Sequence, residues 1–231
     1  MSIKIYEVGG SIRDRFLGLP NSKDRDFVVI ANSYQEMRNY ILEKGGEIFL
    51  EKEIYYTIRA NVPGIGPCDF VLGRKDGAYY DGRRPSEVTI CQSIEEELAR
   101  RDFRCNAIAE DFETKEIIDP FNGIQDIKDR AIRCVGEAED RFTEDSLRLI
   151  RAVRFKITKT FGISLDISFC LQKESLVDLL DNISEERIYD ELMKCFKYDT
   201  LETLHFLENY RYLRNKLFSK NIWLSPSLKE R

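Results

Sequence analysis

Two segments decide the fold of this chain: VGGSIRDRFLG at residues 8–18 and KDRDFVV at residues 23–29. The apolar run Ile3–Val8 predicts a strand, the pair Gly9-Gly10 predicts a turn, and Ser11–Leu17 has the spacing of a short helix. Glycines let the backbone approach an anion, and N–H groups at a helix start face it, so this turn is a candidate phosphate cradle. The alternative is that both glycines serve only the geometry of the turn.

The second segment carries two acids, Asp24 and Asp26, directly before the β-rich run Phe27–Ile30. Side chains alternate along a strand, so both carboxylates are expected on one face, while Arg25 points to the other. Neighbouring carboxylates repel each other unless a cation joins them, and hard oxygen ligands suit Mg²⁺. In two-metal catalysis, one ion activates an attacking hydroxyl and the other neutralises a leaving pyrophosphate. The competing interpretation is a polar start to the strand, in which an aspartate caps a turn.

A third acid, Asp69, lies in the apolar segment CDFVL at residues 68–72. A lone charge is costly in such a strand, so its carboxylate is expected to have a partner. A metal shared with Asp24 and Asp26 is the favoured partner. Backbone amides at a strand end are the alternative.

Composition restricts the chemistry that these 231 residues can support. Hydrophobic residues make up 42% and charged residues 33%, which is typical of a folded globular protein, and no apolar run is long enough to span a membrane. The N-terminus has no signal-peptide core, so a cytoplasmic location is expected. The single histidine, His205, lies in a helical pattern, and the six cysteines form no CxxC pair, which disfavours zinc sites and Ser-His or Cys-His catalysis. Catalysis is therefore expected to rest on carboxylates, metals and arginines.

The pattern of strands and helices divides the chain near residue 136. Residues 1–136 mix strands and helices, and residues 137–231 are almost wholly helical. In the first part we expect a helix over Ser33–Lys44 that stops at Gly45-Gly46, strands at Glu47–Leu50, Ile54–Ala60 and Cys68–Leu72, a loop over Arg74–Glu87, and a helix capped by Ser93. In the second part we expect helices at about Thr143–Thr158, Asp166–Leu180 and Ser184–Phe196, the last opened by a Ser184 cap.

The first of these later helices carries a charged stripe. Glu144, Asp145 and Arg148 are separated by helical spacings, so on a continuous helix they share a face. Asp145 and Arg148 then offer an acceptor and donors to the Watson–Crick edge of a base, and Arg151 and Arg154 extend the stripe toward phosphates. The alternative is a Glu144–Arg148 salt bridge on a solvated helix.

Five ordered segments resemble the signatures of one family: VGGSIRDRFLG…KDRDFVV, RRDFRCNAIAED, DPFNGIQDI, TEDSLRLIRAVRF and SEERIYDELMK. They are similar to those of the class II tRNA nucleotidyltransferase and bacterial poly(A) polymerase family, within the polymerase-β-like superfamily. The resemblance implies an α+β fold: a nucleotidyltransferase head with a small mixed β-sheet over residues 1–136, then an all-helical neck with a nucleotide-selecting template over residues 137–231. In the second signature, Arg104 and Cys105 replace the threonine and aliphatic residue usual in the family.

The resemblance also implies roles for individual residues. Asp24 and Asp26 would bind the catalytic metals, with Asp69 as the third catalytic carboxylate. Arg101, Asp102 and Asn106 would bind the nucleotide and sense its ribose 2′-OH. The full set implied for nucleotide binding is Gly9, Gly10, Arg13, Arg101, Asp102, Asn106, Glu144, Asp145, Arg148, Arg151 and Arg154. The segment Arg74–Glu87 matches the position of the family's flexible loop.

The implied activity is a template-independent, Mg²⁺-dependent transfer of CMP or AMP from CTP or ATP to the 3′-OH of tRNA, as CCA, CC or A addition. The alternatives are a poly(A) polymerase acting on other RNA 3′ ends and a non-catalytic nucleotide- or RNA-binding module. No membrane partner is expected. Longer family members grip tRNA with body and tail domains, and three alternatives are open here: a homo-oligomer or separate subunit that supplies those contacts, a naturally minimal enzyme, or a fragment. The net charge of −5 argues against a general RNA-coating protein.

Overall fold

The computed structural model describes residues 3–20, 25–77, 79 and 86–219. Contacts between Cα atoms divide the chain into two compact units. Among the described residues, the first unit comprises 3–20, 25–77 and 87–129, and the second comprises 79, 86 and 130–219.

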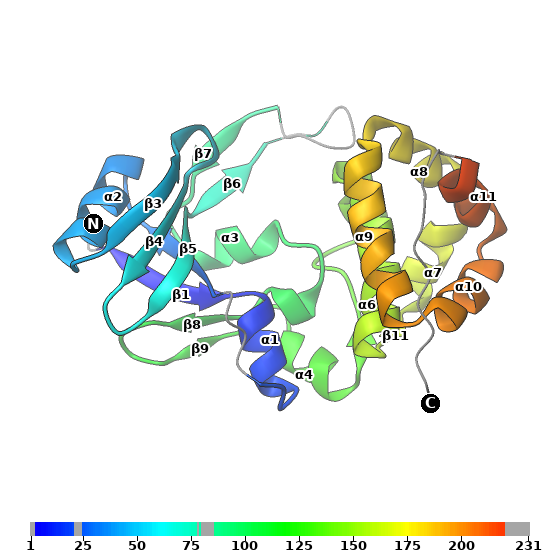
Figure 1. Cartoon of the computed structure of the whole chain (residues 1–231), viewed down its shortest axis with the longest axis horizontal. Coiled ribbons are helices and arrows are strands. Elements are labelled where there is room, and N and C mark those ends of the chain that lie inside the picture. Colours follow the sequence, from blue (N-terminus) through cyan, green and yellow to red (C-terminus); the bar gives the residue numbers. More distant parts are fainter. Residues whose placement is uncertain (1–2, 21–24, 78, 80–85, 220–231) are drawn as a thin grey trace. The chain divides into compact units, whose positions relative to one another are not determined.

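A seven-stranded mixed sheet forms the centre of the first unit (Figure 1). In spatial order its strands are β3 (Glu47–Lys52), β4 (Thr57–Val62), β5 (Gly66–Leu72), β2 (Asp26–Ile30), β1 (Lys4–Val8), β8 (Ala109–Asp111) and β9 (Ile117–Ile118). Strands β2 and β5 run parallel, and every other neighbouring pair is antiparallel. A separate hairpin consists of β6 (Arg74–Asp76) and β7 (Val88–Ile90).

Short helices connect these strands. They are α1 (Gly10–Phe16), α2 (Tyr34–Glu43), α3 (Ile94–Ala99) and α4 (Gly123–Lys128), with 3₁₀ turns η1 (Glu53–Tyr55) and η2 (Arg104–Asn106). Ser33 caps α2 and Ser93 caps α3, since each hydroxyl accepts a hydrogen bond from the backbone N–H three residues later. The caps explain why both helices begin where the sequence predicted.

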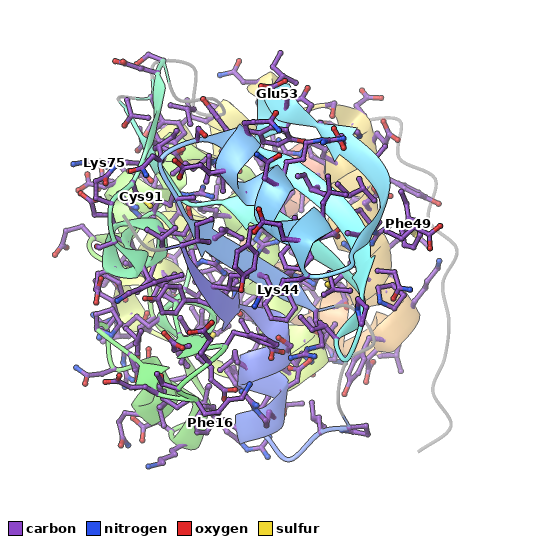
Figure 2. All side chains as sticks on the ribbon, turned by 90° about the vertical axis from the view of Figure 1, so that its left-hand side faces the viewer. Phe16, Lys44, Phe49, Glu53, Lys75 and Cys91 are labelled. Carbon is purple, nitrogen blue, oxygen red and sulfur yellow. The ribbon has the colours of Figure 1, made fainter. Side chains whose placement is uncertain are left out.

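The two faces of the sheet differ in what they carry. Helix α2 packs on one face over a hydrophobic core that includes Ile5, Phe27, Val29, Ile58, Ala60, Cys68, Phe70 and Leu72 of the strands and Tyr34, Met37 and Ile41 of the helix. Figure 2 views the molecule from this side, with Lys44 at the end of α2 and Phe49 on β3 at the surface. Because side chains alternate along a strand, Asp26, Arg59 and Asp69 point to the opposite face.

The second unit is a bundle of helices with one small strand pair, β10 (Ala131–Ile132) and β11 (Gly162–Ile163). Its helices are α5 (Ala138–Glu144), α6 (Leu147–Lys159), α7 (Leu165–Gln172), α8 (Glu174–Asp178), α9 (Glu185–Tyr198), α10 (Thr200–Glu208) and α11 (Arg211–Ser219), with the 3₁₀ turn η3 (Leu179–Asn182). Helices α6 and α9 carry the largest buried apolar stripes. The two units together confirm the predicted α+β fold class.

Three predictions of local structure in the second unit were wrong. The helix expected over residues 143–158 is interrupted, because Asp145 adopts an extended conformation (φ −144°, ψ 100°) between α5 and α6. The helix expected over residues 166–180 is divided into α7, α8 and η3, with extended Lys173 between the first two. Helix α9 begins after Ser184 as expected, but its hydroxyl forms no capping hydrogen bond.

Two predictions failed in part in the first unit. The strand expected over residues 54–60 begins only at Thr57, since Tyr56 takes a left-handed conformation (φ 56°) after the η1 turn. The loop expected over Arg74–Glu87 begins instead with strand β6, which pairs with β7. Residues 78 and 80–85 of that segment, with the arginines at 83 and 84, lie outside the described residues.

The cysteines and the histidine occupy structural positions. All six cysteines are buried and none forms a disulfide, and burial raises the pKa of Cys105 and of Cys195 to about 12, so neither of these two thiols is a reactive nucleophile. His205 is exposed on α10. Within the described part of the chain, no helix combines the length and apolar character needed to cross a bilayer.

Candidate active site

Two acids lie side by side on the face of the sheet opposite α2. Asp26 begins β2, and its register partner across the parallel β2–β5 pair is Asp69. Register partners point to the same face, so their carboxylates project together. Asp24 lies outside the described residues, so its proposed part in metal binding stays a prediction. Among the residues that are described, no cluster of three acids, cysteines or histidines is arranged to hold a metal ion.

Asp69 has a protein partner that the sequence did not predict. Arg59 of β4, the next strand, donates hydrogen bonds from Nε to Oδ1 at 2.9 Å and from Nη2 to Oδ2 at 3.2 Å. The pair is partly exposed, with 32% of the Asp69 side chain accessible. Asp69 therefore has a partner, as expected, and the part proposed for it in metal binding stays a prediction. A metal ion on Asp69 would have to compete with this arginine for the carboxylate.

The Gly9-Gly10 turn joins β1 to α1 beside these acids. Gly9 has φ 77° and ψ −131°, a region that non-glycine residues rarely adopt, and it precedes the first residue of α1. A Cβ at this position would lie 3.2 Å from Nη1 of Arg101 and 4.0 Å from Oδ2 of Asp26. The turn therefore requires glycine for its conformation, and it passes between a cation and an acid of the predicted site.

A buried polar chain links α1 to the residues of the ribose motif. Nη1 of Arg13 donates to Oδ1 of Asn106 at 2.6 Å, and Nδ2 of Asn106 donates to Oδ1 of Asp102 at 3.1 Å. The same Asp102 oxygen accepts the backbone N–H of Phe103 at 2.8 Å. Asp102, Asn106 and Arg13 are each about 7% exposed, so each bond forms where water competes little. Asn106 therefore fixes the orientation of Asp102 and Arg13, since both ends of its amide are engaged.

Arg101 lies at the centre of this group. Its Nη1 donates to the backbone carbonyl of Asn106 at 3.3 Å, and its Nη2 lies 3.6 Å from Oε1 of Glu97. Burial lowers the pKa of Arg101, and the carboxylates of Glu97, Asp102 and Asp26 act in the opposite direction. Nε of Arg101 is buried and has no hydrogen-bond partner among the described residues. The site thus contains a cation with a donor still to be satisfied, next to the glycine turn.

The predicted template residues lie in the second unit, around the break between α5 and α6. Glu144 ends α5 and pairs with Arg148 of α6 at 2.9 Å, while Arg148 also donates to the carbonyl of Arg141 at 3.1 Å. Oδ1 of Asp145 accepts the backbone N–H of Leu147, the first residue of α6, at 3.2 Å. The predicted arrangement on one continuous helical face is therefore wrong. The alternative ion pair between Glu144 and Arg148 is present.

The remaining arginines of the predicted stripe lie along α6. Arg151 and Arg154 are both partly buried. Nε of Arg154 lies 2.7 Å from Oε2 of Glu191, a buried acid of α9 that also accepts from Lys194 at 2.9 Å. Arg154 thus already joins α6 to α9, which gives it a structural role whether or not it contacts phosphate.

Sequence reasoning missed three ion pairs in the first unit, two of them at the site and one on the opposite face of the sheet. Arg59 pairs with Asp69, Glu97 pairs with Arg101, and Arg25 forms two hydrogen bonds with Glu7 at 3.1 and 2.5 Å. The Arg25–Glu7 pair lies on the α2 face, as strand alternation predicts for the residue between Asp24 and Asp26. Only Glu97 had a local signal, since it precedes Arg101 by one helical turn.

Comparison with known proteins places this geometry in context. Residues 5–133 match the model of the poly A polymerase head domain. A CCA-adding enzyme of Ligilactobacillus salivarius (strain UCC118) is 40% identical over 189 residues, which cover 82% of this chain and 44% of the relative. One of Streptococcus uberis (strain ATCC BAA-854 / 0140J) is 38% identical over 191 residues, covering 83% and 45%. The chain therefore spans less than half the length of these relatives.

Solved structures share the fold. The crystal structure of Bacillus stearothermophilus CCA-adding enzyme in complex with CTP has a TM-score of 0.76 at 33% identity, over 89% of this chain and 48% of that one. The Thermotoga maritima CCA-adding enzyme complexed with tRNA has a TM-score of 0.73 at 25% identity, over 96% of this chain and 50% of that one. The similarity covers both the sheet-containing part and the helical part of the chain.

Proposed function

The chain belongs to the poly A polymerase head domain family, and from this premise we propose that it transfers CMP or AMP from CTP or ATP to the 3′-OH of tRNA without a nucleic-acid template. Residues 1–136 would act as the nucleotidyltransferase head, and residues 137–231 as a helical neck that selects the nucleotide. One observation carries the proposal: Asp26 and Asp69 are register partners on one face of the sheet, and the Gly9 turn lies between Asp26 and Arg101. Two similar structures contain CTP or tRNA, which supports both substrate classes.

The carboxylates of Asp26 and Asp69 fit a hard divalent cation, because they are oxygen donors on one face of the sheet. Mg²⁺ held by Asp24 and Asp26 would supply the Lewis acid that favours ionisation of the attacking hydroxyl and neutralises charge on the leaving pyrophosphate. Arg59 already neutralises Asp69, so Asp69 would serve as the third carboxylate by shifting between this arginine and the site.

The chain's own residues would position the nucleotide. The backbone N–H groups at the Gly9-Gly10 turn would face the triphosphate, and Arg101 would use its unpaired Nε donor toward the same anion. Asp102, held in place by Asn106, would accept a hydrogen bond from the ribose 2′-OH and reject a deoxyribose, which has no donor there. These residues contribute mainly by binding and orienting the nucleotide.

Incorporation of labelled CTP and ATP, separately and together, into tRNA that ends before its CCA tests this proposal. Ordered addition of C and then A in the presence of Mg²⁺ is the expected result, with no addition by an Asp24→Ala variant. Addition of A alone, to tRNA and to unrelated RNA, would replace the proposal with a poly(A) polymerase. Binding of ATP without incorporation would contradict catalysis by this chain and favour a nucleotide-binding module or the need for a second chain that supplies RNA contacts.

A further inference from the structure

Glu97 is a buried acid that the proposed reaction does not use. It lies on α3 with 1% of its surface exposed. A carboxylate in such a position is costly unless cations and donors surround it. Its two oxygens face different parts of the first unit: Oε2 faces the β6–β7 hairpin, and Oε1 faces Arg101. The acid therefore lies between a peripheral hairpin and the candidate nucleotide site.

The hairpin is attached to α3 through this carboxylate. Oε2 of Glu97 accepts the backbone N–H of Arg74, the first residue of β6, at 3.0 Å and Nε of Arg100 at 2.8 Å. Arg100 in turn donates from Nη1 to Oδ2 of Asp76, the last residue of β6, at 3.2 Å. Both ends of β6 are thus bound to one ion network. Strand β6 is only three residues long, and these contacts add to the ladder that it forms with β7.

The opposite side of the same carboxylate holds the site arginine. Nη2 of Arg101 lies 3.6 Å from Oε1 of Glu97, while its Nη1 reaches the carbonyl of Asn106 and lies against Gly9. An arginine has several rotatable bonds, and an anchor at one end of the guanidinium reduces the entropy lost when the other end binds an anion. The anchor is supplied by Glu97.

We propose that Glu97 is a positioning residue that couples the β6–β7 hairpin to Arg101, so that a nucleotide on Arg101 and the hairpin stabilise each other. The proposal rests on the proposed function in that Arg101 is taken as a nucleotide ligand. Since coupling between two sites is reciprocal, nucleotide binding must then protect the hairpin, and an altered hairpin must weaken nucleotide binding.

A Glu97→Gln variant tests whether Glu97 positions Arg101 for nucleotide binding. Glutamine keeps the size of the side chain and one carbonyl oxygen but removes the charge. We expect the KM for CTP and for ATP to rise roughly tenfold with kcat nearly unchanged, since Arg101 binds the nucleotide equally in the ground and transition states. Glu95→Gln, on the exposed side of α3, is the matched control and is expected to leave both constants unchanged.

A double substitution separates positioning of Arg101 from a general structural role. In an Arg101→Ala background, adding Glu97→Gln is expected to have no further effect on KM, since the residue through which Glu97 acts is gone. The same increase in KM with and without Arg101 would overturn the proposal.

Hydrogen exchange tests whether bound nucleotide stabilises the β6–β7 hairpin, and this measurement does not depend on turnover. CTP is expected to slow amide exchange over Arg74–Asp76 in the unsubstituted chain, and this protection is expected to vanish in Glu97→Gln and in Arg101→Lys, which keeps Glu97 intact. Equal protection by CTP in all three chains would overturn the coupling. If Glu97→Gln does not fold, the comparison of Arg101→Lys with the unsubstituted chain tests the coupling alone. Because the exchange needs only bound CTP, CTP-dependent protection without incorporation would support the coupling while contradicting the proposed reaction.

Discussion

The two units bring their predicted site residues together by different means. In the first unit, Gly9, Asp26 and Asp69 belong to separate elements, and the sheet register aligns them. In the second unit, Asp145 and Arg148 are close in sequence, and the helix expected to align them is interrupted. Alternation along a strand holds wherever the ladder is intact, whereas helical spacing holds only where the helix is continuous. The first arrangement is therefore fixed by the sheet register, whereas in the second Arg148 pairs locally with Glu144 and Asp145 lies 3.6 Å from Arg187 of α9.

The largest expected effect is at the acid that the sheet register places. Asp26→Ala is expected to lower kcat/KM for CTP incorporation into tRNA by about 10³-fold or more, because loss of a metal ligand removes several kcal/mol of charge stabilisation. Glu47→Ala, an exposed acid on edge strand β3, is the matched control and should retain full activity. Activity of Asp26→Ala close to that of the control would show that Asp26 is not catalytic. It would also contradict the view that the sheet register aligns the catalytic residues of the first unit.

A pair of glycines compares the packing of the two units. A Cβ on Gly123 would lie 2.1 Å from the carbonyl oxygen of Arg104, the first residue of η2, whereas a Cβ on Gly136 would meet nothing within 4 Å. Gly123→Ala is expected to destabilise the chain by about 3 kcal/mol or more, since backbone must move. Gly136→Ala is expected to cost about 1 kcal/mol, from its positive φ of 76° alone. Urea unfolding of both variants measures the difference, and equal losses would contradict the steric account.

Several strands and helix starts of the first unit could be predicted from the sequence. Apolar runs separated by glycines predict β1, β2 and β5, and the serines before α2 and α3 predict where those helices begin, since each signal acts over a few residues. The Arg59–Asp69 and Glu97–Arg74 contacts could not be predicted, because they join residues that are neighbours only after the chain folds. Strand β6 was missed for the same reason.

The sequence contains a local signal for the break between α5 and α6, although helical spacing predicted one continuous helix there. Asp145-Ser146 consists of two residue types that favour helix starts over helix interiors, because their side chains compete for backbone N–H groups. Asp145 does so by accepting the N–H of Leu147. The ion pair of Arg148 with Glu144 survives the break because α6 begins within one turn of the end of α5.

The proposed template residues give the next effect, and they test whether the interrupted segment still selects a base. Arg148→Ala is expected to change the ratio of C to A incorporation by about thirtyfold, since a pair of specific hydrogen bonds to a base edge contributes about 2 kcal/mol of discrimination. Arg211→Ala, an exposed arginine of α11, is the control. An unchanged ratio in Arg148→Ala would leave the residue with only its structural contacts to Glu144 and Arg141.

The smallest expected effect concerns the charged pairs that hold β1 in register with its neighbouring strands. Glu7 of β1 and Glu110 of β8 are register partners, and like charges directly opposite destabilise a sheet unless each is neutralised. Arg25 neutralises Glu7, and Arg15 neutralises Glu110 at 2.6 Å. Burial opposes ionisation of Glu7, but hydrogen bonds from Arg25 and Ser11 outweigh it and hold the pKa of Glu7 below its ordinary value.

A depressed pKa in the folded state fixes the sign of the pH dependence. The contribution of Glu7 to stability is fully present above the pKa of an unfolded glutamate and is lost as pH falls through its lower folded pKa. Glu7→Gln is therefore expected to destabilise β1 and β2 by on the order of 1 kcal/mol at neutral pH and to flatten the acid part of the stability curve. Amide exchange of β1 and β2 between about pH 3 and pH 7 measures both quantities, with exposed Glu113→Gln as the control. The same acid slope in both variants would show that Glu7 does not hold the register on which Asp26 depends.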